Sequence, residues 1–153
     1  MIALIESGLV ARLKSDAAVS ALVGSRIRPL TLQQGETLPA LVYQKISDVP
    51  DYAMGGQTGL AAARIQIASW TDGQMNDGSS GYSQAKRLAE AVRLCLSGWR
   101  GTVAVGADSV EVDWVELDNQ TDLYDPEAGR GLPMYAVISD YMVAYRQGIP
   151  RWQ

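Results

Sequence analysis

The extended run PMYAVISDYMVAYRQ near the end of the chain is apolar on both of its faces. Side chains in a strand alternate between two faces, so residues two apart lie on the same side. One face carries Tyr135, Val137, Tyr141, Val143 and Tyr145, and the other carries Met134, Ala136, Ile138, Met142 and Ala144. A sheet with one face in water shows alternating apolar and polar residues instead. We therefore expect both faces of this strand to be covered.

Helices are expected to cover one of these faces, which leaves three possible covers for the other. They are the loops of the same chain, a second sheet layer and a neighbouring subunit. Large contiguous apolar patches on a protein surface often mark contacts with partners. This favours a neighbouring subunit, with a self-packed sandwich of two sheets as the alternative.

Two earlier runs, residues 38–47 and 60–70, have the same two-sided character and are joined by DVPDYAMGGQTG, residues 48–59. We predict that this segment is a loop, mobile in the isolated protein and ordered by a partner, with a surface hairpin as the alternative. Its glycines raise the entropic cost of ordering, while Tyr52 and Met54 offer an apolar tip. The residues predicted to contact partners or other subunits are Asp48, Asp51, Tyr52, Met54, Tyr135, Tyr141 and Tyr145.

Three segments have helical patterns. Ile2, Ile5, Leu9 and Leu13 are spaced for one helix face. A short second helix, AAVSALV, follows Asp16 as its N-cap and ends at Gly24. SQAKRLAEAVRLCLSG has the clearest apolar stripe in the chain.

A hairpin at residues 101–118, with a bulge near Asp113 and Trp114, and a polar loop at 119–132 follow this third helix. The order of these elements predicts one α+β domain over residues 1–153. We expect a mostly antiparallel sheet with two main helices packed on one face.

Composition excludes several kinds of site. The 153 residues include no histidine and one cysteine, so neither a Ser-His-Asp triad nor a histidine or multi-cysteine zinc site can form within the chain. The loop GQMNDGSS lacks the lysine of a phosphate-binding loop and the ligand pattern of a calcium loop. The net charge of −4 argues against a dedicated nucleic-acid binder, and the apolar runs are too short to span a membrane. We expect no enzyme activity, no cofactor and no metal.

The order of several stretches resembles a known family. DAAVSALVGSRIRPL is followed by GETLPALVYQKISD, ARIQIASW, YSQAKRLAEAVRLCLSG and DLYDPEAGRGLPMYAVISDYMVAY. Together they cover nearly the whole chain, and VGSRIRP followed by LPALVYQ is the most telling pair. The chain resembles the tail terminator, or tail completion, proteins of bacteriophages and prophages with long, non-contractile tails.

The resemblance implies a structural protein of the virion tail or neck, assembled in the host cytoplasm, with an α+β fold. Such proteins form a ring, usually a hexamer, that caps the tail tube, ends its elongation and joins it to the head. The implied partners are other copies of the chain, the tail tube protein and a head connector or stopper protein. DNA passes through the lumen without specific binding, and no membrane is involved.

An acidic lumen would repel phosphates and so would not retard the passage of DNA. We selected lumen candidates because they cluster in one polar segment. These candidates are Asp118, Asp122, Asp125 and Glu127.

Two alternatives from other classes stay open. One is an adaptor or stopper protein of the neck, which also forms rings and differs mainly in its position in the particle. The other is a small enzyme or ligand-binding domain with a carboxylate-lined pocket. The two-faced strands and the absence of histidine argue against this second alternative.

Overall fold

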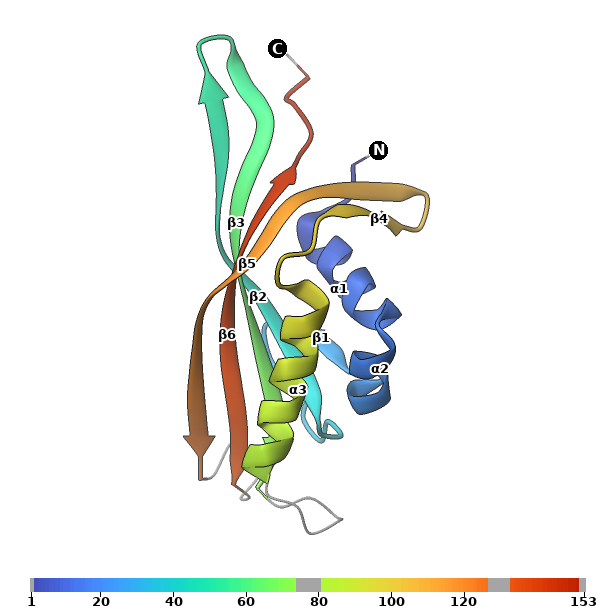
Figure 1. Ribbon diagram of the computed structural model, residues 1–153, viewed down its shortest axis with the longest axis vertical. Coiled ribbons are helices and arrows are strands. Elements are labelled where there is room, and N and C mark those ends of the chain that lie inside the picture. Colours follow the sequence, from blue (N-terminus) through green and yellow to red (C-terminus); the bar gives the residue numbers. More distant parts are fainter. Residues whose placement is uncertain (1, 74–80, 127–132, 152–153) are drawn as a thin grey trace.

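In a computed structural model that describes residues 2–73, 81–126 and 133–151, the chain forms three helices and one six-stranded sheet (Figure 1). The helices are α1 (Ile5–Ser15), α2 (Ala17–Val23) and α3 (Gly81–Leu96). The strands are β1 (Ile27–Pro29), β2 (Ala40–Ala53), β3 (Gly56–Asp72), β4 (Gly101–Val105), β5 (Asp108–Asp125) and β6 (Met134–Arg146). The predicted α+β class is confirmed.

The strands lie in the order β1-β2-β3-β6-β5-β4, and only the short pair β1–β2 is parallel. β3 and β6 form the centre of the sheet and pair without a register break from Leu60 opposite Arg146 to Asp72 opposite Met134. The strands on either side carry bulges, because the register shifts twice in the β2–β3 pair and twice in the β5–β6 pair. One of these shifts, between Val112 and Trp114, confirms the bulge predicted near Asp113.

All three helices pack against the same face of the sheet (Figure 1). The apolar stripe of α3, including Leu88, Val92 and Leu96, is buried against β3, β5 and β6. α2 begins where predicted, because the Asp16 carboxylate accepts hydrogen bonds from the backbone N–H groups of Ala18 and Val19. α1 approaches the sheet closely at Gly8, where an added Cβ would meet a Val110 methyl at 2.3 Å.

Two segments predicted to be loops are largely strand. β2 continues to Ala53 and β3 begins at Gly56, so the predicted loop at 48–59 is a paired hairpin with a turn at Met54 and Gly55. Pro50 is compatible with this strand because β2 has an open outer edge there. β5 likewise continues to Asp125, through the first half of the predicted polar loop. In both cases hydrogen bonding to a long neighbouring strand outweighs the local preference for a turn.

Candidate interaction surfaces

The sheet face opposite the helices has no second sheet layer among the described residues, so the two-sheet sandwich is not the cover (Figure 1). The segment 30–38 covers only one end, where Leu32 and Leu38 pack against Ala40, Trp70 and Met134. Outside the area that this segment covers, Val49, Trp114 and Leu123 are 63%, 47% and 41% exposed. We call this surface the open face. It has the apolar character that predicts a covering partner.

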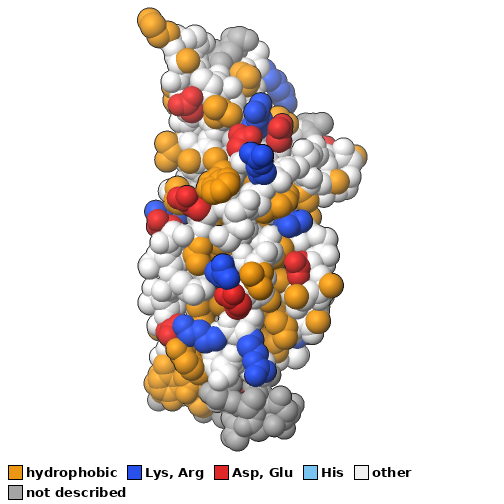
Figure 2. All heavy atoms as spheres, viewed as in Figure 1, with side chains coloured by type: hydrophobic (Ala, Val, Ile, Leu, Met, Phe, Trp, Pro, Cys, Tyr) orange, Lys and Arg blue, Asp and Glu red, His pale blue; other side chains and the backbone are white. Residues whose placement is uncertain are grey.

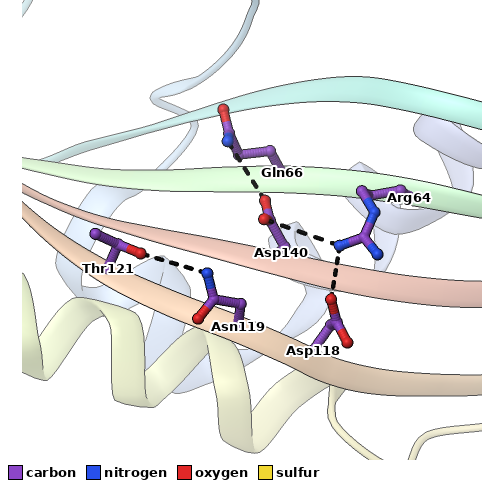
Figure 3. Close-up of polar contacts among 6 residues, drawn as sticks. All are labelled: Arg64, Gln66, Asp118, Asn119, Thr121 and Asp140. Carbon is purple, nitrogen blue, oxygen red and sulfur yellow. Dashed lines mark hydrogen bonds and ion pairs between the residues drawn. The ribbon is translucent and has the colours of Figure 1, made fainter.

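A band of polar side chains crosses the middle of the open face (Figure 3). The Arg64 guanidinium donates to Asp118 at 2.7 Å and lies 3.9 Å from the Asp140 carboxylate, which also accepts a bond from Gln66 at 3.3 Å. Asn119 donates to Thr121 on the same strand. Because these charges already have partners within the chain, another protein could cover the face without leaving Arg64 as an unpaired buried charge.

The far half of the β2–β3 hairpin forms an arm that extends past the helix layer (Figure 1). Cross-strand bonds stiffen it: Gln57 donates to the Tyr52 hydroxyl at 2.8 Å and Thr58 donates to the Asp51 carboxylate at 2.8 Å. Tyr52 is 63% exposed and Met54 is fully exposed at the turn, and hydrophobic atoms are visible at this end of the molecule in Figure 2. The predicted apolar tip is therefore present, but on a hydrogen-bonded hairpin and not on a loop.

Asp48 ties the base of the arm to the core. Its carboxylate accepts a bond from the Tyr145 hydroxyl at 2.5 Å and pairs with Lys45 at 3.0 Å, and Lys45 also contacts Glu6 of α1. Burial, followed by the contact with Asp48, raises the pKa of Tyr145. The Lys45 pKa is raised chiefly by its bond to Glu6. Asp48 is thus placed for a structural role within its own chain.

Tyr141 and Tyr145, selected from sequence as contact residues, lie on the face of β6 that the helices cover. They are 0% and 4% exposed, so a partner cannot reach them in this fold. Burial also raises the pKa of Tyr141. The even-numbered face of β6, with Met142 and Ala144, is the one that remains partly accessible.

An aromatic cluster lies near the end of β5. The ring centroid of Tyr135 lies 5.0 Å from that of Tyr124 and 6.0 Å from that of Tyr82. Tyr124 and Tyr82 are about half exposed. Sequence reasoning found Tyr135 but not the other two. They come from a different strand and a helix, and no local pattern indicates that the three rings meet.

The predicted lumen carboxylates do not share one face of the sheet. Asp118 reaches Arg64 on the open face, and Asp125 pairs in register with Met134, whose side chain is also on that face. Asp122 points to the helix side, where Lys86 and the Tyr82 hydroxyl contact it and lower its pKa. Glu127 lies outside the described residues. What Asp118, Asp122 and Asp125 share is the strand β5, whose outer edge β4 covers only from Asp108 to Val112.

The described residues show neither an activated cysteine nor a cluster of metal ligands. Cys95 is buried under α1, and burial raises its thiol pKa to about 11, so little reactive thiolate forms at neutral pH. No three potential metal ligands cluster within residues 2–73, 81–126 and 133–151. None of the helices described is long and apolar enough to cross a membrane.

The sequence of residues 7–146 matches the family described as Tail completion protein gp17. The chain belongs to this family. It is a structural tail completion protein and not an enzyme, as the resemblance in sequence implied.

The fold of this tail completion protein is also found in a chain of a solved structure described as the virion of a native gene transfer agent particle. That chain is 16% identical, with a TM-score of 0.64, and the match covers 94% of this protein and 95% of that chain. No curated protein sequence shows significant similarity to this tail completion protein.

Proposed function

We propose that this tail completion protein forms a closed ring, hexameric on the tail, that caps the tail tube, ends its elongation and joins the tail to the head. The observation that carries this proposal is the open face, which spans four long strands and is covered by the chain itself only at one end. Chains that associate through two different surfaces close into a ring when the rotation between neighbours permits it. The fold shared with a chain of a virion particle supports such a role.

The helix layer of the next copy is our proposed cover for the open face. α3 carries three basic residues and one acidic residue, and Arg87 and the 70% exposed Leu94 lie on its outer side. Val49, Trp114 and Leu123 are exposed apolar side chains of the open face that this layer would cover. A contact between two different surfaces passes from each copy to the next, whereas two open faces in contact would give a closed symmetric pair.

Within this ring we propose that the outer edge of β5 points toward the channel. An edge strand aimed at the lumen exposes side chains from both of its faces, so Asp118, Asp122 and Asp125 can all flank the channel although they do not share a face. Glu127 follows them in sequence. Their negative charge would keep DNA from binding during its passage.

The ring is tested by native mass spectrometry of the full chain over a range of concentrations, together with electron microscopy of completed tails. We expect closed oligomers and a ring of this protein at the end of the tube that meets the head. A monomer in solution together with a single copy per tail would refute the proposal. A ring located on the head connector, and absent from tails that lack heads, would instead identify a neck adaptor.

The acidic channel is tested by changing Glu116 and Asp125 to lysine, since neither takes part in the ion pairs of Arg64 and Lys86. Each lysine that neutralises a phosphate adds about 0.9 to the slope of log affinity against log salt. We expect salt-sensitive DNA binding and slower genome passage, whereas Glu90→Lys on α3 should change neither. Unchanged DNA retention and passage in the double variant would show that β5 does not line the channel.

A further inference from the structure

A cavity of about 460 Å³ lies beside the base of the arm. Separate parts of the chain form it: Gly59 and Leu60 of β3, residues 146–149 at and after the end of β6, the β4–β5 hairpin, and Ile2 near the N-terminus. Backbone bonds hold these parts together, from Gln147 N–H to the Gly59 carbonyl and from Ala3 N–H to the Ser109 carbonyl. The cavity is therefore part of the folded structure.

Large apolar side chains line this cavity but are not buried by the chain itself. Ile2, Leu60 and Ile149 are 48%, 42% and 55% exposed, and all three line the cavity. Arg146 and Glu111 add polar groups, 3.8 Å apart. A hollow that combines exposed apolar side chains with polar groups can accept side chains of both kinds, such as the methionine and tyrosine of an apolar tip.

The arm carries side chains of the matching kind. Met54 projects fully into solvent at the turn, and Tyr52 is 63% exposed beside it. The Tyr52 hydroxyl accepts a bond from Gln57, so its own proton can be donated to a carboxylate such as Glu111. A neutral donor on the arm thus complements an acidic group at the cavity.

The arm cannot fill the cavity of its own chain. Thr58 and Gly59, at the base of the arm, line the cavity, whereas Met54 lies four residues before Thr58. At about 3.3 Å per residue, four residues of strand separate them by about 13 Å. Folding the tip back would break the pairing of Tyr52 with Gln57 and of Ala53 with Gly56.

We infer that the tip of the arm, Tyr52 to Met54, inserts into the cavity at Leu60 and Ile149 of a second copy of this chain. An apolar projection and a hollow at different places on one molecule make a contact that passes from each copy to the next. Such a contact is the kind that a ring requires, and this inference rests on the ring proposed above. In this arrangement the arm contacts another copy of the chain within the ring, and not the tail tube or the head.

The test is a pair of cysteines, Met54→Cys with Leu60→Cys, in rings of the full chain and in completed tails. Within one chain these residues are too far apart along the hairpin for a disulfide, which needs Cα atoms within about 7 Å. The matched control is Met54→Cys with Leu94→Cys, because Leu94 is exposed on α3 and does not line the cavity. The native Cys95 is buried and does not compete.

We expect mild oxidation of the 54–60 variant to give a ladder of covalent oligomers up to the size of the ring, and the 54–94 control to stay monomeric on a denaturing gel. Met54→Asp should abolish ring formation in solution while leaving the melting temperature unchanged. Rings that form normally without a 54–60 cross-link would overturn this inference and leave the ring itself intact. Absence of any ring, in solution and on tails, would overturn both proposals.

Discussion

The two faces of the same sheet differ in what covers them, although both are apolar at many positions. On the helix side, Ile65 and Tyr141 are 1% and 0% exposed, and they belong to one continuous core. On the open face, the residues next to them in sequence, Gln66 and Met142, remain partly accessible. The helix side therefore holds the main buried core of the subunit, whereas the open face stays partly accessible, and we expect the two faces to respond differently to substitution.

The strongest test of this comparison uses adjacent residues that point to opposite faces. Ile65→Ala removes buried methyl groups and should lower the free energy of unfolding by about 2–5 kcal/mol. Gln66→Ala loses one partly exposed hydrogen bond to Asp140 and should cost about 1 kcal/mol or less. Urea unfolding of the isolated chain measures both. Equal losses would mean that the open face is as important to the subunit as its core.

The close packing on the helix side can be probed at Gly8, where α1 lies against β4 and β5. The Cβ added by Gly8→Ala would lie 2.3 Å from a Val110 methyl and 3.1 Å from a Val103 methyl. We expect this overpacking to cost about 1–3 kcal/mol by thermal or urea unfolding. Ser7→Ala, one residue away on α1, should change stability by no more than about 0.5 kcal/mol. If both variants melted alike, α1 would not be closely packed against the sheet.

High pH should weaken the helix side through its buried tyrosines. The pKa values of Tyr141 and Tyr145 are raised by burial, so the folded state keeps their protons where the unfolded state, with a pKa of about 10, releases them. Stability is therefore complete below about pH 10 and falls as the pH rises above it. Tyr145→Phe should cost about 1 kcal/mol at pH 8, because the bond to Asp48 is lost.

Melting temperatures at pH 8 and pH 10.5 measure the effect of Tyr145. We expect the decrease between the two pH values to be smaller in Tyr145→Phe than in the natural sequence, since one titrating group has been removed. An identical decrease in both proteins would assign the alkaline loss to other groups.

The smallest effect on the subunit is expected on the open face itself. Val49 is 63% exposed, so Val49→Ser should change the unfolding free energy of the monomer by no more than about 0.5 kcal/mol. The same change should weaken ring assembly, because it removes apolar surface that the next copy would cover. Light scattering against concentration measures assembly. A destabilised monomer with unaltered assembly would reverse the roles assigned to the two faces.

Local sequence patterns determined the helices, the fold class and one detail of the sheet. The stripe of α3, the Asp16 cap of α2 and the bulge at Asp113 are each encoded within a few residues, through helical spacing, a capping carboxylate and a slip in strand alternation. The two-faced pattern of β6 was also evident in the sequence, and the cover that it predicts for the open face stays a prediction.

Only the tertiary structure decided where those residues lie. Residues 48–59 and 119–125 have the composition of loops, yet all of them except the turn at 54–55 are strand, because they hydrogen-bond to a neighbouring strand. The helices cover the face of β6 that carries Tyr141 and Tyr145, and so these two side chains are buried. The choice of face depends on packing between α3 and the sheet. The cavity beside the arm joins Ile2, Leu60 and Ile149, which are far apart in sequence. Local propensity acts over a few residues, whereas register and packing depend on partners distant in the chain, so no local pattern could reveal these features.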